Sequence, residues 1–152
     1  LFLYPNTPYV LFTCFILKVT FSHVILMNIS PAKSSNDAAM FDIDDTLIRS
    51  GDKSLIKDTF RILRLARTFR YKIIIMTARP PEAREYTEEQ LRDYGIPWDG
   101  LYLVPASKKG ETKRKTGLRF VLSVGDLDTD CTDSIYKLKL PGPHDSRGYF
   151  VG

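Results

Sequence analysis

A short apolar run that ends in three aspartates constrains this chain more than any other feature. Residues 38–41 are Ala-Ala-Met-Phe, a run typical of a buried strand, and they lead directly into Asp42, Asp44 and Asp45. Side chains alternate along a strand, so Asp42 and Asp44 point to one side and Ile43 to the other. Because like charges this close repel each other, a cation should compensate them. Mg²⁺ prefers oxygen ligands and keeps positions open for a phosphate.

Two further apolar runs end in polar residues. Residues 73–76 lead into Thr77, and residues 120–124 lead into a glycine followed by Asp126 and Asp130. In an open parallel sheet, ligands bind beyond the carboxyl ends of the strands. We therefore expect the ends of all three strands to meet in one crevice.

The rest of the chain alternates expected helices with expected strands. Apolar residues recur at helical spacing over residues 54–67, and a second helix should start at Pro80-Pro81 and stop at Gly95. Short strands are expected over residues 101–104 and 136–140. This order predicts a three-layer α/β/α fold with a doubly wound, mostly parallel sheet.

Length and composition fit one folded domain. The chain has 152 residues, 43% of them hydrophobic, which is enough for one sizeable core. We predict that residues 38–152 form it, after a linker of residues 28–37. The apolar residues 1–27 are either upstream translation or a fragment, with Met27 as the true start, or a membrane anchor. The protein would be cytoplasmic in the first case and membrane-anchored or exported in the second.

Charge and cysteine content narrow the classes of site. The net charge of +4 is partly concentrated in residues 108–119, which suggests an anionic substrate. Two cysteines far apart provide no disulfide framework, and His23 and His144 are too scattered for a zinc site. The metal suggested by this composition is therefore one bound by oxygen atoms.

Taken together, these motifs resemble those of the haloacid dehalogenase-like phosphohydrolases. The resemblance implies that Asp42 is a nucleophile that forms an aspartyl-phosphate, and that Asp44 is the general acid that later activates water. It also implies that Thr77 hydrogen-bonds the transferring phosphoryl group. Asp126 and Asp130 would hold Mg²⁺ together with Asp42 and the backbone carbonyl of Asp44.

The same resemblance requires a lysine that neutralises the phosphoryl charge. The family's aromatic-Lys-x-x-x-Arg segment aligns with residues 112–117, which favours Lys113. Gly117 stands where the family has Arg, so Lys115, four residues before Arg119, remains an alternative. The other charges here would form a solvated face or a nucleic-acid contact. The candidates crowded into this segment are Lys108, Lys109, Lys113, Arg114 and Lys115.

Within the family, the resemblance is closest to the capless acid-phosphatase-like branch (class IIIB). That branch begins with Asp-x-Asp-Asp-Thr, and its Thr-Gly-Arg-Pro segment appears here as Thr-Ala-Arg-Pro at residues 77–80. Neither the gap of residues 44–77 nor that of residues 77–113 has room for a separate cap domain. Such an open site implies a bulky phosphorylated substrate or a lid supplied by a partner.

Three more residues are expected near the substrate. Arg49 lies in a small flap beside the site, and Thr46 closes the first motif. Arg79 either contacts the substrate or packs at the start of the helix that follows it. The resemblance does not choose between these two roles.

Three functions are compatible with these residues. The first is a Mg²⁺-dependent phosphomonoesterase of the acid-phosphatase type. The second is a polynucleotide 3′-phosphatase, which the open site and the basic residues 108–119 suggest. The third is a phospho-receiver or phosphate-binding module without turnover. No specific protein partner is predicted, and a membrane is relevant only if the apolar leader is an anchor.

Overall fold

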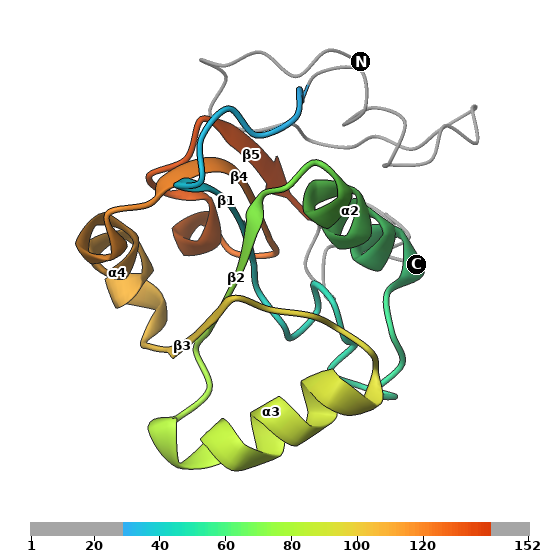
Figure 1. Cartoon of the computed structure of the whole chain (residues 1–152). Helices are drawn as coiled ribbons and strands as arrows, with labels where there is room; N and C mark the ends of the chain where they lie inside the picture. Colours follow the sequence, from blue (N-terminus) through green and yellow to red (C-terminus); the bar gives the residue numbers. More distant parts are fainter. Residues whose placement is uncertain (1–28, 141–152) are drawn as a thin grey trace.

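Five parallel strands form one sheet at the centre of the molecule (Figure 1). The computed structural model describes residues 29–140, and the apolar leader lies outside the described residues. The order across the sheet is β3-β2-β1-β4-β5. The predicted strands are confirmed with small shifts at their ends: β1 (Asp37–Phe41), β2 (Lys72–Thr77), β3 (Gly100–Leu103), β4 (Arg119–Gly125) and β5 (Tyr136–Lys139).

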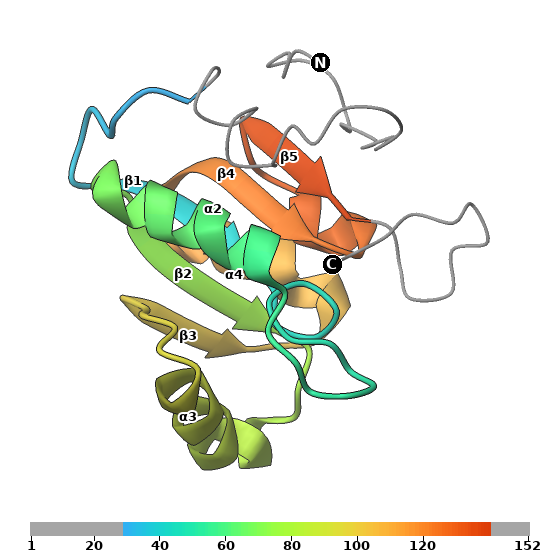
Figure 2. The ribbon, with the colours of Figure 1, turned by 90° about the vertical axis from the view of Figure 1, so that its right-hand side faces the viewer.

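Helices cover both faces of this sheet (Figure 2). Helices α2 and α3 pack on one face and α4 lies on the other, so the predicted three-layer α/β/α architecture is confirmed. The helices are α2 (Lys57–Thr68), α3 (Arg84–Asp93) and α4 (Lys109–Thr116), with short 3₁₀ turns η1 (Pro81–Ala83), η2 (Ala106–Lys108) and η3 (Asp128–Cys131). Within residues 29–140, no helix has the length and apolar character to cross a bilayer.

The alternation of side chains along the strands divides the core in two. Phe41 and Ile75 point to the large cluster beneath α2 and α3, whereas Met40 and Ile74 point to a smaller cluster on the other face. All four are almost fully buried. The core strands are therefore apolar on both faces, as expected for a covered parallel sheet.

Helix α2 begins later than the predicted start at residue 54. Leu55 forms an isolated β-bridge with Ile48, and the Ile56 N–H donates to the Leu47 carbonyl at 2.8 Å. These bonds tie residues 54–56 to the loop after β1 and keep them out of the helix. The predicted end of the following helix is confirmed, because Gly95 adopts φ +67° directly after α3 and its cap, a conformation that glycine accepts without a steric penalty.

The segment expected to be a linker packs on the domain over its described residues. Ile29 is buried in the large cluster, the Ala32 N–H donates to the Phe69 carbonyl at 2.8 Å, and the Tyr71 hydroxyl donates to the Ser30 carbonyl at 2.5 Å. Asp37 already belongs to β1. The folded part therefore begins well before residue 38.

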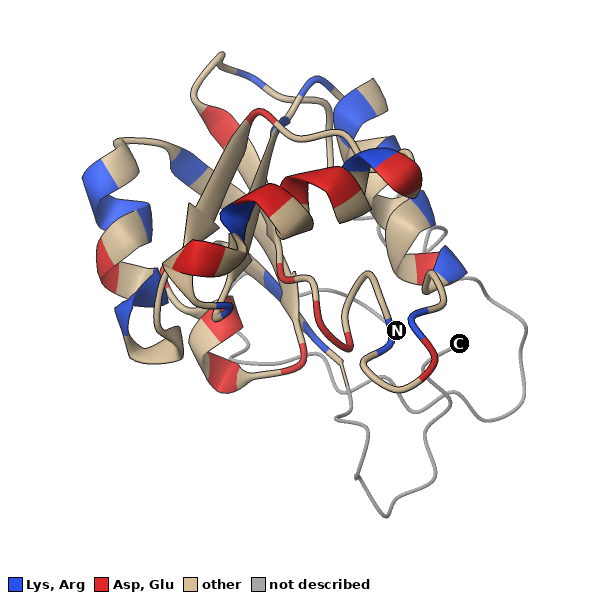
Figure 3. Ribbon diagram, turned by 90° about the horizontal axis from the view of Figure 1, so that it is seen from below, with Lys and Arg blue, Asp and Glu red and all other residues tan. Residues whose placement is uncertain are grey.

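Helix α4 differs from the other helices in how it is buried. Its two buried residues are Lys109 and Lys113, and it carries no apolar stripe. In Figure 3, α4 is largely blue, whereas α3 mixes both charges. The face of the sheet under α4 is thus closed partly by the alkyl stems of two lysines, whose charged ends need partners inside the protein.

Candidate active site

Acidic side chains from two distant stretches of the chain meet beside β1, where the strand order of the sheet reverses. The chain runs from β1 through β2 to β3, then returns through α4 to β4 on the other side of β1. Asp42 follows β1 and Asp126 follows β4, and each has a carboxylate oxygen within 4.8 Å of the other and of one from Asp130. The fold thus brings these residues together at the carboxyl ends of the strands, as predicted.

A glycine lets Asp130 fold back onto the end of β4. A Cβ atom at Gly125 would lie 2.2 Å from the Cβ and 2.3 Å from Oδ2 of Asp130. Asp130 is completely buried, and its Oδ2 accepts the Leu127 N–H at 3.0 Å. The glycine before Asp126 is therefore required by the close approach of the second aspartate in the Gly-Asp-x-x-x-Asp pattern.

Lys109 supplies the cation among these carboxylates. Its Nζ donates to Asp42 Oδ1 at 2.9 Å and also to Asp130 Oδ1, and its side chain is 0% exposed. The resemblance had favoured Lys113 or Lys115, so the lysine beside the acids is corrected to Lys109. Helix α4 has no apolar stripe to show which of its sides faces inward, so the sequence carries no clear signal that singles out this lysine.

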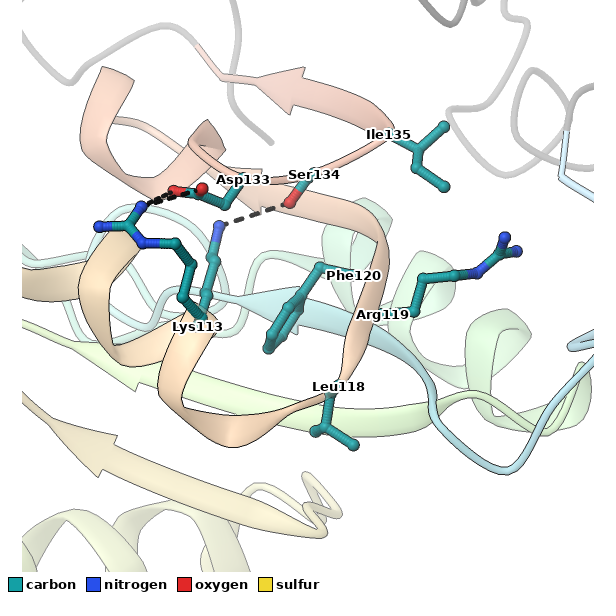
Figure 4. Close-up of a pocket in the computed structure, with 8 residues that line it drawn as sticks. Lys113, Leu118, Arg119, Phe120, Asp133, Ser134 and Ile135 are labelled. Carbon is teal, nitrogen blue, oxygen red and sulfur yellow. Dashed lines mark hydrogen bonds and ion pairs between the residues drawn. The ribbon is translucent and has the colours of Figure 1, made fainter.

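Lys113 lies one turn further along α4, and Figure 4 shows its amino group directed toward the Ser134 hydroxyl, 3.4 Å away. Its Nζ donates to the carbonyls of Asp130 and Thr132 at 2.6 Å each and to Ser123 Oγ at 2.9 Å. Lys115, the alternative, is exposed and pairs with Glu111 at 2.6 Å. Neither is bonded to the carboxylate oxygens of the acid cluster.

Burial governs the charges of this cluster. Burial raises the pKa of Asp42 well above its ordinary value, and the charge of Asp130 adds to this while Lys109 opposes it. Burial also raises the pKa of Asp126, with the same help from Asp130. For Lys109, burial alone would lower the pKa, but the charges of Asp42 and Asp130 outweigh it and raise it. The site therefore favours additional positive charge.

The donor atoms of the cluster fit a hard divalent cation. Three carboxylates lie close together, and Lys109 offsets only part of their combined charge. Oxygen atoms from aspartates are the ligands that Mg²⁺ takes in proteins. A metal role for the backbone carbonyl of Asp44 stays a prediction.

Arg79 holds Asp44 rather than standing free at the helix start. Its Nε and Nη2 donate to the two carboxylate oxygens of Asp44 at 2.9 and 2.8 Å, and Nη1 donates to Thr87 Oγ1 at 3.2 Å. The hydrogen bonds to Asp44 raise the pKa of Arg79. Thr77 is buried at the end of β2, and its Oγ1 accepts the Arg79 N–H at 3.3 Å. Arg79 thus connects the ends of β1 and β2.

The loop after Asp44 forms the expected flap. Asp45 has φ 57°, and its carboxylate accepts the N–H and the hydroxyl of Ser50 at 2.9 and 2.7 Å. Arg49 donates to Ser54 Oγ at 2.8 Å within the flap. Thr46 is fully buried, and its hydroxyl is one of the few buried side-chain groups within residues 29–140 with no hydrogen-bond partner. Substrate contacts by Thr46 and Arg49 stay predictions.

The segments around the site contain no separate cap within residues 29–140. Residues 44–77 hold the flap and α2, and residues 77–109 hold η1, α3, β3 and η2. The carboxylate of Asp44 is 38% exposed, so the site is reached from solvent beside Arg79. This openness agrees with the prediction from the spacing of the motifs.

Comparison with known proteins gives one informative match. The profile of the haloacid dehalogenase-like hydrolases matches residues 39–121. No curated protein matches the chain. A chain of a solved Pnkp1/Rnl/Hen1 complex is 26% identical with a TM-score of 0.44, over 49% of this chain and 30% of that chain. The aligned part is therefore less than a third of that chain.

Proposed function

Because the chain belongs to the haloacid dehalogenase-like hydrolases, we propose that it is a Mg²⁺-dependent phosphomonoesterase that transfers the phosphoryl group to Asp42. The observation that carries the proposal is the contact of Lys109 with both Asp42 and Asp130, beside Asp126. Attack of a carboxylate on a phosphate ester brings two anions together, so a nucleophilic aspartate needs cations around it. The acid-phosphatase type is part of this proposal.

The residues that would hold Mg²⁺ are Asp42, Asp126, Asp130 and the backbone carbonyl of Asp44. The bound ion would supply positive charge that reduces the repulsion between carboxylate and phosphate. Lys109 would neutralise a further phosphoryl oxygen, and the Thr77 hydroxyl would position the group. One oxygen of Asp42 attacks phosphorus, and the bond between phosphorus and the ester oxygen breaks.

Asp44 would move the protons of both steps. It gives a proton to the departing ester oxygen, then takes one from the water that attacks the phosphoryl group on Asp42, which releases phosphate. The two hydrogen bonds from Arg79 hold the Asp44 carboxylate in place before the substrate binds. We expect the phosphate of the substrate to draw Arg79 away, which frees the Asp44 side chain to face the reacting oxygen atoms.

The test compares two substitutions of aspartate by asparagine. In Asp42→Asn, turnover of a simple phosphate ester with Mg²⁺ should fall by at least about 10³-fold, with the fold retained by circular dichroism. Asp128→Asn is the matched control, because this side chain is 70% exposed on the same loop as Asp130. Removal of Mg²⁺ with a chelator should abolish the activity of wild type and control alike. Turnover by Asp42→Asn near the wild-type rate would exclude the proposal.

The basic run gives little support to the polynucleotide alternative. Lys108 and Lys115 both pair with Glu111, and Arg114 pairs with Asp133 at 3.0 Å. Each of these exposed cations therefore already has a carboxylate partner, either Glu111 on α4 or Asp133 in the loop before β5. A nucleic-acid role would need support from another part of the molecule.

A further inference from the structure

A cavity of about 300 Å³ lies between the flap and α3. That volume is at the lower end of the range for small-molecule sites. The hydroxyl of Tyr94 donates to the Lys53 carbonyl, which fixes the flap against the end of the helix. The lining residues are one from the flap and five at helical spacing along α3 and its cap: Lys53, Tyr86, Glu89, Gln90, Asp93 and Tyr94.

This cavity is connected to the acid cluster through Arg79. The Arg79 guanidinium lies 5.9 Å from the centre of the Tyr86 ring and also donates two hydrogen bonds to Asp44. Tyr86 is 57% exposed, although large aromatic side chains usually lose most of their exposure on folding. The exposed ring of Tyr86 is thus linked through Arg79 to Asp44, the proposed general acid.

One residue that lines the cavity, Gln90, carries a buried acceptor. Gln90 is only 9% exposed, and its Oε1 has no hydrogen-bond partner among the described residues. A buried acceptor without a donor is costly, so such groups in native proteins usually meet water or a ligand. Glu89 and Asp93 add two further acceptors beside it. The ligand suited to this wall carries N–H donors.

Resting on the proposed phosphatase activity, we propose that this cavity binds an amino-bearing nucleobase, so that the substrate is a nucleoside monophosphate or a nucleotide at a strand end. The base stacks on Tyr86 and donates an N–H to Gln90 Oε1. Nucleobases combine a flat face, which stacks on aromatic side chains, with amino groups on their edges. Sugars without a base lack the flat face, and phenyl rings lack the donors.

Steady-state kinetics test this assignment. Wild type should hydrolyse AMP with a higher kcat/KM than ribose 5-phosphate, which lacks the base. Tyr86→Ala should lower kcat/KM for AMP by roughly 10- to 100-fold, the usual contribution of one stacked base, and leave ribose 5-phosphate unchanged. Tyr86→Phe keeps the ring and should have the wild-type kcat/KM for AMP. Gln90→Ala should lower kcat/KM for AMP and leave that for ribose 5-phosphate unchanged. Glu85→Ala, exposed on α3 outside the cavity, is the matched control.

A second measurement separates this inference from the proposed activity. Adenosine, which has no phosphate, should bind wild type and Asp42→Asn equally in saturation-transfer NMR and should not bind Tyr86→Ala. Adenosine binding without any phosphatase activity would leave the cavity assignment standing and overturn the proposed function. Equal effects of Tyr86→Ala on AMP and ribose 5-phosphate, or equal turnover of phenyl phosphate and AMP, would overturn the nucleobase assignment alone. A 3′-phosphorylated oligonucleotide preferred over AMP would identify the strand end as the source of the base.

Discussion

Lys109 and Lys113 lie one turn apart on the same side of α4, and both are almost completely buried, yet they are in opposite electrostatic environments. Lys109 meets the carboxylates of Asp42 and Asp130, and their charges raise its pKa although burial opposes this. Lys113 meets carbonyls and hydroxyls, and burial lowers its pKa to about 8. Burial alone therefore does not set the charge of a lysine, because ionised partners decide it.

The two lysines also contact different atoms of the same residue, Asp130. Lys109 binds the carboxylate of Asp130, and Lys113 binds its backbone carbonyl. We infer that Lys109 belongs to the reacting centre and that Lys113 positions the loop that carries Asp130. Substitutions on α4 and at the end of β4 can separate these two roles.

The largest effect is expected from Lys109→Met. Without the ammonium, Asp42 approaches phosphate without its cation, and kcat should fall by roughly 10²- to 10³-fold with saturating Mg²⁺. Lys108→Met is the matched control, because its side chain is 62% exposed and pairs with Glu111. A Lys109→Met enzyme as active as Lys108→Met would remove Lys109 from the centre.

Gly125→Ala should displace Asp130, the residue that both lysines contact. The added methyl group would lie 2.2 Å from Asp130 Cβ, so the turn η3 must shift and carry Asp130 away from Asp42. We expect a loss of about 3 kcal/mol in the free energy of unfolding and roughly 10²-fold in kcat. The comparison is Gly51→Ala, where a Cβ meets nothing within 4 Å. Equal urea midpoints and rates for the two variants would refute the close-approach argument.

Lys113→Met should affect stability more than chemistry. The carbonyls of Asp130 and Thr132 would lose a buried donor, which should cost about 3 kcal/mol in urea unfolding. The loss in kcat should be well below that of Lys109→Met. Lys115→Met, at a side chain 74% exposed, provides the control. If Lys113→Met were as inactive as Lys109→Met but as stable as Lys115→Met, the two lysines would not have separate roles.

The smallest effect concerns pH. Lys113 has a folded pKa of about 8 against an ordinary value of 10.5. Between these values the unfolded chain holds a proton that the folded protein has released, so the contribution of Lys113 to stability rises with pH. The difference in unfolding free energy between wild type and Lys113→Met, measured without metal, should widen by about 2 kcal/mol from pH 8 to pH 10. A constant or narrowing difference would show that Lys113 stays charged in the fold.

The sequence was sufficient to predict the strands of the sheet and the proximity of the aspartates that follow them. Apolar runs such as residues 38–41 identified the strands, and the rule for parallel sheets placed Asp42 near Asp126. The lysine was not predictable in the same way, because α4 has no apolar stripe to show which of its sides faces inward. The pairing of Arg79 with Asp44 depends on the path of the flap, which no periodicity in the sequence encodes.

The most direct test of the account is to trap the phosphoryl group on the protein. Acid quenching during turnover of a ³²P-labelled ester, followed by peptide mass spectrometry, should place the label on Asp42 as an acyl phosphate that neutral hydroxylamine removes. The label should be absent from Asp42→Asn and should accumulate in Asp44→Asn with an aryl phosphate, because loss of the base slows its release. Turnover with no label on Asp42, or with the label on another residue, would contradict the account.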